Sequence, residues 1–189
     1  AITPNIATPV SSPAMVVRVK SPLRNRSRGM MGSAARRSIA TNAGQVLDAD
    51  WTLSLPQHVT AATGIDAMVH AIEAYTSKRL KNPYADFLAC EALRLLAANL
   101  QTVCRDPQNR EARQAMMLGA CLAGQAFANA PVGGVHALAY PVGGIFHVPH
   151  GLSNSLVLPH VLKFNLPAAQ ALYAELAVVV NVADEGDAE

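Results

Sequence analysis

Aromatic residues are scarce in this chain of 189 residues. Phe, Trp and Tyr together make up 5% of it, whereas apolar residues as a whole make up 51%. Much of the apolar content is Ala and Leu, which favour closely packed helices over a sheet. The composition therefore predicts a mainly α-helical fold, and the length suffices for one domain with its own core.

Long apolar runs and paired cysteines are also lacking. No run approaches the roughly 18–20 residues of a membrane helix, so we expect no membrane partner. The cysteines, Cys90, Cys104 and Cys121, are odd in number and show no CxxC spacing. They are interpreted as reduced core residues rather than as a disulfide framework or a metal cluster, which agrees with a cytoplasmic protein.

Acidic residues are absent from the first 47 positions, which hold seven basic ones; the remainder holds eight basic and thirteen acidic residues. The segment 1–45 shows little periodicity and is rich in Pro, Ser, Gly and Asn, which predicts irregular structure. It could be a binding arm for nucleic acid or membrane, a transit-like peptide, or a segment outside the native fold. We favour the last interpretation and expect no nucleic-acid partner, because the segment lacks interleaved aromatics. Residues 46–189 are the predicted helical domain.

The helical part divides at proline, glycine and polar breaks. A first helix is predicted after Pro56, running to about Ser77, with Thr60 or Thr63 helping to cap its start. Further helices are expected at about 84–103 and 109–129, and another follows the break at 131–134. A loop with His147 and His150 comes next, and two last helices are predicted at about 151–164 and 167–182.

Two short stretches, 64–70 and 134–151, concentrate the residues that can do chemistry. Asp66 and His70 are four apart, which on a helix places both on one face with Cβ atoms about 5–6 Å apart. Such a pair is commonly a surface hydrogen bond. Its flanks, Ile65-Asp66-Ala67-Met68-Val69-His70-Ala71-Ile72, are apolar nearly all round, and a buried carboxylate needs a partner or a metal.

His136 and His150 lie fourteen apart and are separated by two prolines and two glycines. This connection cannot be one unbroken helix, and a bend could return His150 to an ion that His136 touches. One carboxylate with three imidazoles suits a divalent transition metal, zinc or iron, better than magnesium or calcium.

These residues resemble the iron-containing (group III) alcohol dehydrogenases. The similarity runs from about 46 to 180 and includes VLDADWTLSLP, TAATGIDAMVHAIEAYTS, GVHALAYPVGGIFHVPHG and LSNSLVLPHVLKFN. The resemblance implies the helical metal-binding domain of a dehydroquinate synthase-like fold and an Fe²⁺ centre, with Zn²⁺ as the alternative. Its ligands would be Asp66, His70, His136 and His150. It also implies catalytic roles for Tyr140, where many members carry His, and for His147, which could instead be a polar loop residue.

The implied activity is hydride transfer between an alcohol or aldehyde and NAD(P), with the ion as a Lewis acid. In the family an α/β domain with Gly-rich loops precedes this part, and no such loop stands in this sequence. We therefore expect a fragment that is inactive alone, and a homo-oligomer stays open as its assembly. The alternatives are a non-catalytic metal-binding or assembly module and a relative that catalyses hydroxyacid–oxoacid transhydrogenation.

Overall fold

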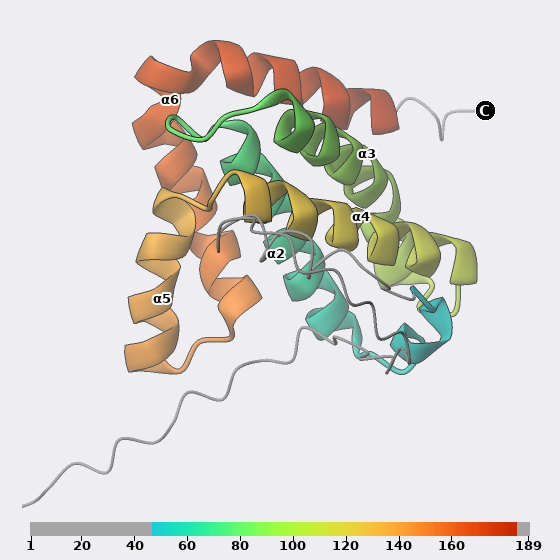
Figure 1. The fold of residues 1–189 in the computed structure, drawn as a ribbon. Helices are drawn as coiled ribbons and strands as arrows, with labels where there is room; N and C mark the ends of the chain where they lie inside the picture. Colours follow the sequence, from blue (N-terminus) through green and yellow to red (C-terminus); the bar gives the residue numbers. More distant parts are fainter. Residues whose placement is uncertain (1–46, 185–189) are drawn as a thin grey trace, which may run out of the picture.

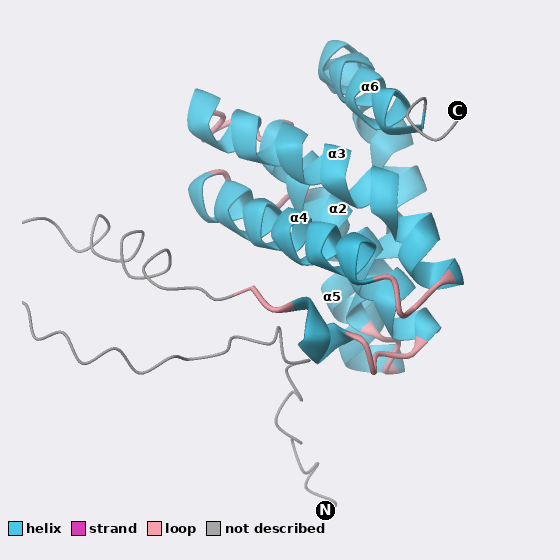
Figure 2. Ribbon diagram, turned by 90° about the vertical axis from the view of Figure 1, so that its right-hand side faces the viewer, coloured by secondary structure: helices cyan, strands magenta, loops and turns pink. Residues whose placement is uncertain are grey.

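The computed structural model describes residues 47–184, with side chains described to residue 180. A short 3-10 helix, η1 (Ala49–Thr52), precedes five α-helices. These are α2 (Gln57–Tyr75), α3 (Pro83–Arg105), α4 (Arg110–Asn129), α5 (Gly134–Phe146) and α6 (His150–Asp184). The described part contains no strand (Figure 2), which confirms the predicted mainly α fold. The segment 1–45 lies outside the described residues.

Helices α3 and α4 begin where local capping chemistry allows. Asn82 caps α3 by accepting a hydrogen bond from the Ala85 amide, and Pro83 occupies the first turn, where a missing N–H is no loss. Asn109 caps α4 in the same way, through the Ala112 amide. The predicted starts at about 84 and 109 are therefore close to the observed ones.

The expected threonine cap of α2 is wrong. Pro56 occupies the N-cap position and makes no side-chain cap bond. The Thr63 hydroxyl donates back to the Val59 carbonyl one turn earlier, as threonines inside helices do. Thr60 is buried and accepts a hydrogen bond from Arg113 of α4. The hydroxyls are thus used within α2 and between helices.

The predicted end of a helix at about 164 is also wrong, because α6 continues through Pro159 and Pro167 to Asp184. A proline removes one backbone hydrogen bond and bends a helix without necessarily ending it. Figure 1 shows the result: α6 rises beside α5 and then turns to cross the end of the bundle near α3.

Small side chains dominate the core between α2, α3 and α4. Ala71, Ala89 and Ala92 are fully buried there, together with Leu93 and Leu96. Alanines let helix axes approach closely, which explains how a sequence poor in aromatics fills its interior. This close packing holds α2 as a rigid support for the side chains of Asp66 and His70.

Helix α3 is long and apolar enough, by length and composition, to cross a membrane. Among the described helices, α4 and α5 pass the same test only as a pair bent by 107°. Core helices of water-soluble proteins also pass it. Here Leu93 and Leu96 of α3 are fully buried against neighbouring helices, so the test gives weak support for a membrane span.

Candidate metal centre

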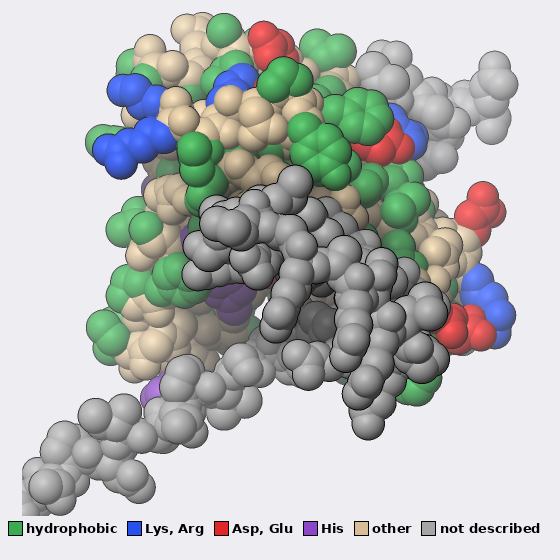
Figure 3. Space-filling model, viewed as in Figure 1, with side chains coloured by type: hydrophobic (Ala, Val, Ile, Leu, Met, Phe, Trp, Pro, Cys, Tyr) green, Lys and Arg blue, Asp and Glu red, His purple; other side chains and the backbone are tan. Residues whose placement is uncertain are grey.

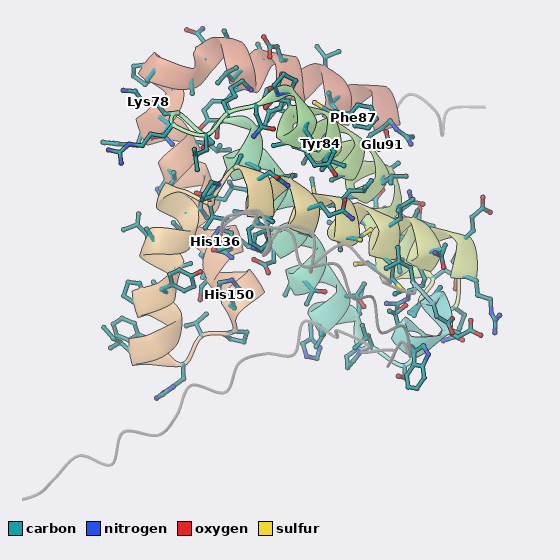
Figure 4. The ribbon with its side chains drawn as sticks, viewed as in Figure 1. Lys78, Tyr84, Phe87, Glu91, His136 and His150 are labelled. Carbon is teal, nitrogen blue, oxygen red and sulfur yellow. The ribbon has the colours of Figure 1, made fainter. Side chains whose placement is uncertain are left out.

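The site forms where α5 and the start of α6 meet the middle of α2. Figure 4 shows the labelled His136 and His150 in this region, between α5 and α2. His136 lies in the first turn of α5, and His150 opens α6 after the loop 147–149. The chain reverses there, as the prolines and glycines between the two histidines predict.

A close approach of two backbones brings His150 to Asp66. A side chain on Gly151 would collide with the Ala62 carbonyl group of α2, so glycine is required for this contact. Ala62 stands one helical turn before Asp66. The approach at Gly151 therefore sets the preceding residue, His150, against the carboxylate.

Three side chains converge on one point. The Nε2 atoms of His150 and His136 lie 3.4 Å and 3.5 Å from Asp66 Oδ1. One ligand atom from each of the three residues lies within 4.8 Å of the others. Ligands about 2.1 Å from a tetrahedral ion stand about 3.4 Å apart, so the spacing fits a transition-metal site.

His70 lies beside this group of three. Its Nδ1 atom is 3.9 Å from Asp66 Oδ1. Its ring stacks on Phe127, with centroids 4.6 Å apart, and lies 4.3 Å from the ring of His136. The sequence placed His70 correctly on the face of Asp66, but its role as a ligand stays a prediction.

Asn154 stands among the converging ligand atoms. Its Nδ2 donates to Asp66 Oδ1 at 2.5 Å and is 3.2 Å from the Nε2 atoms of both His136 and His150. Its Oδ1 is buried without a hydrogen-bond partner among the described atoms. The Asn154 Nδ2 group thus contacts the same carboxylate and imidazole atoms that a cation would contact, and the buried Oδ1 lacks a partner of its own. These observations fit a metal.

The charges of the site are strongly coupled. Burial raises the pKa of Asp66, but the hydrogen bond from His136 and the nearby His70 and His150 outweigh it and hold that pKa below its usual value. Burial lowers the pKa of His136, yet hydrogen bonds to Asp66 and Glu73 raise it to about 9. Burial lowers the pKa of His70, with Asp66 opposing. In the absence of metal, His136 is therefore a cation between two carboxylates.

Two residues of the site were not singled out from the sequence, although a helical pattern could have found both. Glu73 follows Asp66 by seven positions and so shares its face of α2, and its Oε2 lies 2.6 Å from His136 Nδ1. Asn154 follows His150 by four positions on α6. Neither residue type belongs to the Asp and His set from which the ligands were predicted.

Tyr140 and His147 differ in their relation to the site. The Tyr140 ring stacks on His150, with centroids 5.7 Å apart, and is 60% exposed at the rim. His147 ends α5 in the left-handed conformation, with φ of 56°, and is exposed. No interaction joins His147 to the ligand group in the described part of the chain, so its catalytic role stays a prediction.

The C-terminal end of α5 is apolar and exposed. Ile145 and Phe146 of α5 are 68% and 71% exposed. Figure 3 shows hydrophobic side chains along α5 and a histidine beside them. A separate cavity of about 360 Å³ is lined by Glu73 and residues such as Lys78 and Tyr173. None of the four predicted ligands lines it, so it is distinct from the metal site.

Comparison with known proteins gives a consistent picture. A family model described as "Fe-containing alcohol dehydrogenase family, C-terminal" matches residues 60–189. The long-chain-alcohol dehydrogenase 1 of Geobacillus thermodenitrificans is 49% identical over 95 residues, which cover 50% of this chain and 24% of the relative. The 1,3-propanediol dehydrogenase of Citrobacter freundii is 43% identical over 134 residues, covering 71% of this chain and 34% of the relative.

Solved structures of similar proteins have the same arrangement of helices. A crystal structure of a 1,3-propanediol oxidoreductase has a TM-score of 0.66 at 44% identity. The similarity covers 68% of this chain and 33% of that one. The described helices thus have the arrangement found in part of a protein about three times longer than the matched region.

Proposed function

Because the chain belongs to the iron-containing alcohol dehydrogenase family, we propose that residues 47–184 are the metal-binding helical part of an NAD(P)-dependent alcohol dehydrogenase. The reaction is hydride transfer between a small alcohol or aldehyde and a nicotinamide. The observation that carries the proposal is the convergence of Asp66, His136 and His150, within 4.8 Å, from three separate helices. The chain spans 24% to 34% of the relatives named above, so the whole reaction belongs to the proposal.

The donor set supports a divalent transition metal. A carboxylate and imidazoles accept Fe²⁺ and Zn²⁺, whereas Mg²⁺ and Ca²⁺ prefer oxygen ligands. We propose Asp66, His136 and His150 as ligands, with His70 as the fourth. His70 needs only a local turn of its ring, since its Nδ1 already lies 3.9 Å from Asp66 Oδ1. We take iron as the first assignment and zinc as the alternative.

A bound ion would act as a Lewis acid on the alcohol or carbonyl oxygen. The residues around the site position the ligand atoms for that ion. Asp66 and Glu73 supply negative charge on either side of His136, and Asn154 holds the Asp66 carboxylate by its 2.5 Å hydrogen bond. Their fixed positions keep the ligand atoms converged before any substrate arrives.

We propose that substrate approaches the metal centre from the side of Tyr140 and His147. Tyr140 is 60% exposed beside His150, so its ring and hydroxyl can contact a small alcohol at the rim. His147 lies in the loop that leads into His150, three residues before it. We assign both residues to the lining of the substrate pocket.

The exposed apolar end of α5 also suits contact with a nucleotide-binding domain. Ile145 and Phe146 are exposed side chains of the kind that a neighbouring domain buries. A nicotinamide held by such a domain would meet the substrate on this face. The cysteines are odd in number and show no CxxC spacing, and on this ground we propose a reducing, cytoplasmic location.

A chimera tests the function directly. The matching 134-residue part of the Citrobacter freundii 1,3-propanediol dehydrogenase is replaced by the corresponding part of this chain, and NAD-dependent oxidation of propanediol is assayed. We expect activity in the chimera and none after His150→Ala, while the exposed-surface variant Glu91→Gln keeps it. A folded, metal-loaded chimera without activity would contradict the dehydrogenase assignment.

A further inference from the structure

Glu73 is a buried carboxylate that belongs to neither the predicted ligands nor the protein surface. It is 7% exposed and lies on α2, two helical turns after Asp66. A buried carboxylate is costly unless its oxygens accept hydrogen bonds from well-placed donors. The hydrogen-bond partners of Glu73 therefore indicate its role in the structure.

Both oxygens of Glu73 are used by α5. Oε1 accepts from the Val135 amide at 2.6 Å, and Oε2 lies 2.6 Å from Nδ1 of His136. The Val135 amide belongs to the first turn of α5, where backbone N–H groups have no partner within the helix. Gly133 leaves room for this carboxylate, since a side-chain carbon there would come within 3.3 Å of Oε1.

The contact with His136 fixes where the ring carries its proton. An ionised carboxylate can only accept, so Nδ1 of His136 must donate to Glu73. The neutral ring that keeps this bond has its lone pair on Nε2, the atom 3.5 Å from Asp66 Oδ1. This is the only neutral tautomer that offers a ligand atom to the metal site.

We propose that Glu73 is a positioning residue of the metal centre, which fixes the ring orientation and the tautomer of His136 while anchoring the first turn of α5. The inference rests on the proposed metal function. A carboxylate that accepts from the other ring N–H of a metal-binding histidine also makes the ligating nitrogen more basic. Glu73 thus joins α2, which carries Asp66, to α5, which carries His136, through one side chain.

The substitution Glu73→Gln separates this role from simple packing. A glutamine has nearly the same shape but only one oxygen, whereas Val135 and His136 both need an acceptor. If the oxygen accepts from Val135, the amide NH₂ faces His136 Nδ1 and shifts the ring proton to Nε2, where it blocks the metal. We expect Zn²⁺ affinity of the full chain to fall about 10- to 100-fold, measured by competition with a chelator.

Glu91→Gln is the matched control. Glu91 of α3 pairs with Arg94 on the surface, so the variant makes the same change of charge away from the site. We expect it to bind Zn²⁺ like the wild type. If neither the wild type nor this control binds Zn²⁺, the metal function itself fails, and the inference fails with it.

A spectroscopic signal distinguishes positioning from a structural role. In the Zn²⁺-loaded wild type, histidine NMR should show His136 with a hydrogen-bonded proton on Nδ1, and Glu73→Gln should lose this signal. Wild-type affinity in Glu73→Gln, or weaker binding with the Nδ1 proton retained, would overturn the proposal. Should that variant not fold by circular dichroism, Glu73→Asp decides: it keeps the charge one methylene further from the ring, and unchanged affinity there would equally overturn it.

Discussion

His150 and His70 are expected to contribute unequally to metal binding. His150 Nε2 lies 3.4 Å from Asp66 Oδ1, whereas His70 Nδ1 is 3.9 Å away and its ring stacks on Phe127. A metal ion would have to draw the His70 ring toward Asp66 and away from Phe127, whereas a ligand atom of His150 already lies within 4.8 Å of those of Asp66 and His136. We predict that His150→Ala weakens Zn²⁺ binding more than His70→Ala does, by about tenfold, a difference near 1.4 kcal/mol.

Competition titrations of both variants against one chelator measure this order. His160→Ala serves as a control, because His160 belongs to α6 but not to the ligand group. Equal losses in the His70 and His150 variants would show that His70 is as strong a ligand as His150 and that its stacking on Phe127 costs nothing.

His136 makes the stability of the metal-free chain depend on pH. Its pKa is raised to about 9 in the folded state from an ordinary value of 6.5. The stabilisation from a raised pKa is complete below the unfolded pKa and disappears as the pH rises through the folded one. We predict that the melting temperature of the metal-free protein falls by several degrees between pH 6.5 and 9.5.

Saturating Zn²⁺ provides the comparison for that experiment. The ion takes the place of the proton on His136 Nε2, so the metal-loaded chain should lose this decline between pH 6.5 and 9.5. A metal-free chain with a flat melting temperature over the same range would contradict the paired cation between Asp66 and Glu73.

At the residue scale, the sequence predicted which side chains come together, while their role as metal ligands stays a prediction. Asp66, His136 and His150 follow from residue type and spacing and meet in the structure. Helical spacing places Glu73 and Asn154 on the faces of Asp66 and His150, but their contacts with His136 depend on helices that approach from distant parts of the chain. Their contacts with His136 span 63 and 18 positions, a separation that no local pattern encodes.

At the scale of elements, the approach of α6 to α2 controls the site. A side chain on Gly151 would meet the backbone carbonyl of Ala62, which cannot move aside as a flexible side chain could. We predict that Gly151→Ala destabilises the chain by about 1–3 kcal/mol and weakens metal binding, because the start of α6 must shift away from Asp66.

Gly124→Ala, in α4, is the control for Gly151→Ala. A side chain at Gly124 meets nothing within 4 Å. It should leave metal binding unchanged and stabilise the helix by up to about 1 kcal/mol. Denaturant unfolding and Zn²⁺ titration of both variants test the pair, and wild-type behaviour of Gly151→Ala would show that the two helices are free to separate.

The sequence predicted helix boundaries well where a nearby side chain caps the helix. It failed where packing between helices determines whether a helix continues. Asn82 with Pro83 and Asn109 mark the starts of α3 and α4 through bonds within three residues. Two separate helices were expected at about 151–164 and 167–182, but α6 continues through Pro167, with Leu176 buried in the core formed by the other helices. Contacts between helices thus outweighed the local cost of a proline.

At the scale of the whole molecule, we predict that the 189-residue polypeptide does not turn over alcohols with NAD or NADP. Its sequence has no Gly-rich turn of the kind that holds a dinucleotide pyrophosphate. A nicotinamide that is not held near the substrate forgoes a proximity effect of about 7–11 kcal/mol. Calorimetric titration of the metal-loaded chain with NADH, followed by an aldehyde-reduction assay, should show weak binding and no turnover; micromolar binding with steady turnover would contradict this.

The metal content of Asp66→Asn tests the central claim most directly. Asn keeps the shape of Asp66 but removes the one charge that the converging histidines share, while Asp50→Asn, at an exposed pair with Arg110, removes the same charge elsewhere. After anaerobic loading with Fe²⁺ or Zn²⁺, the wild type and Asp50→Asn should each hold about one ion per chain, and Asp66→Asn should hold almost none. Equal metal content in all three proteins would contradict a metal centre at Asp66, His136 and His150.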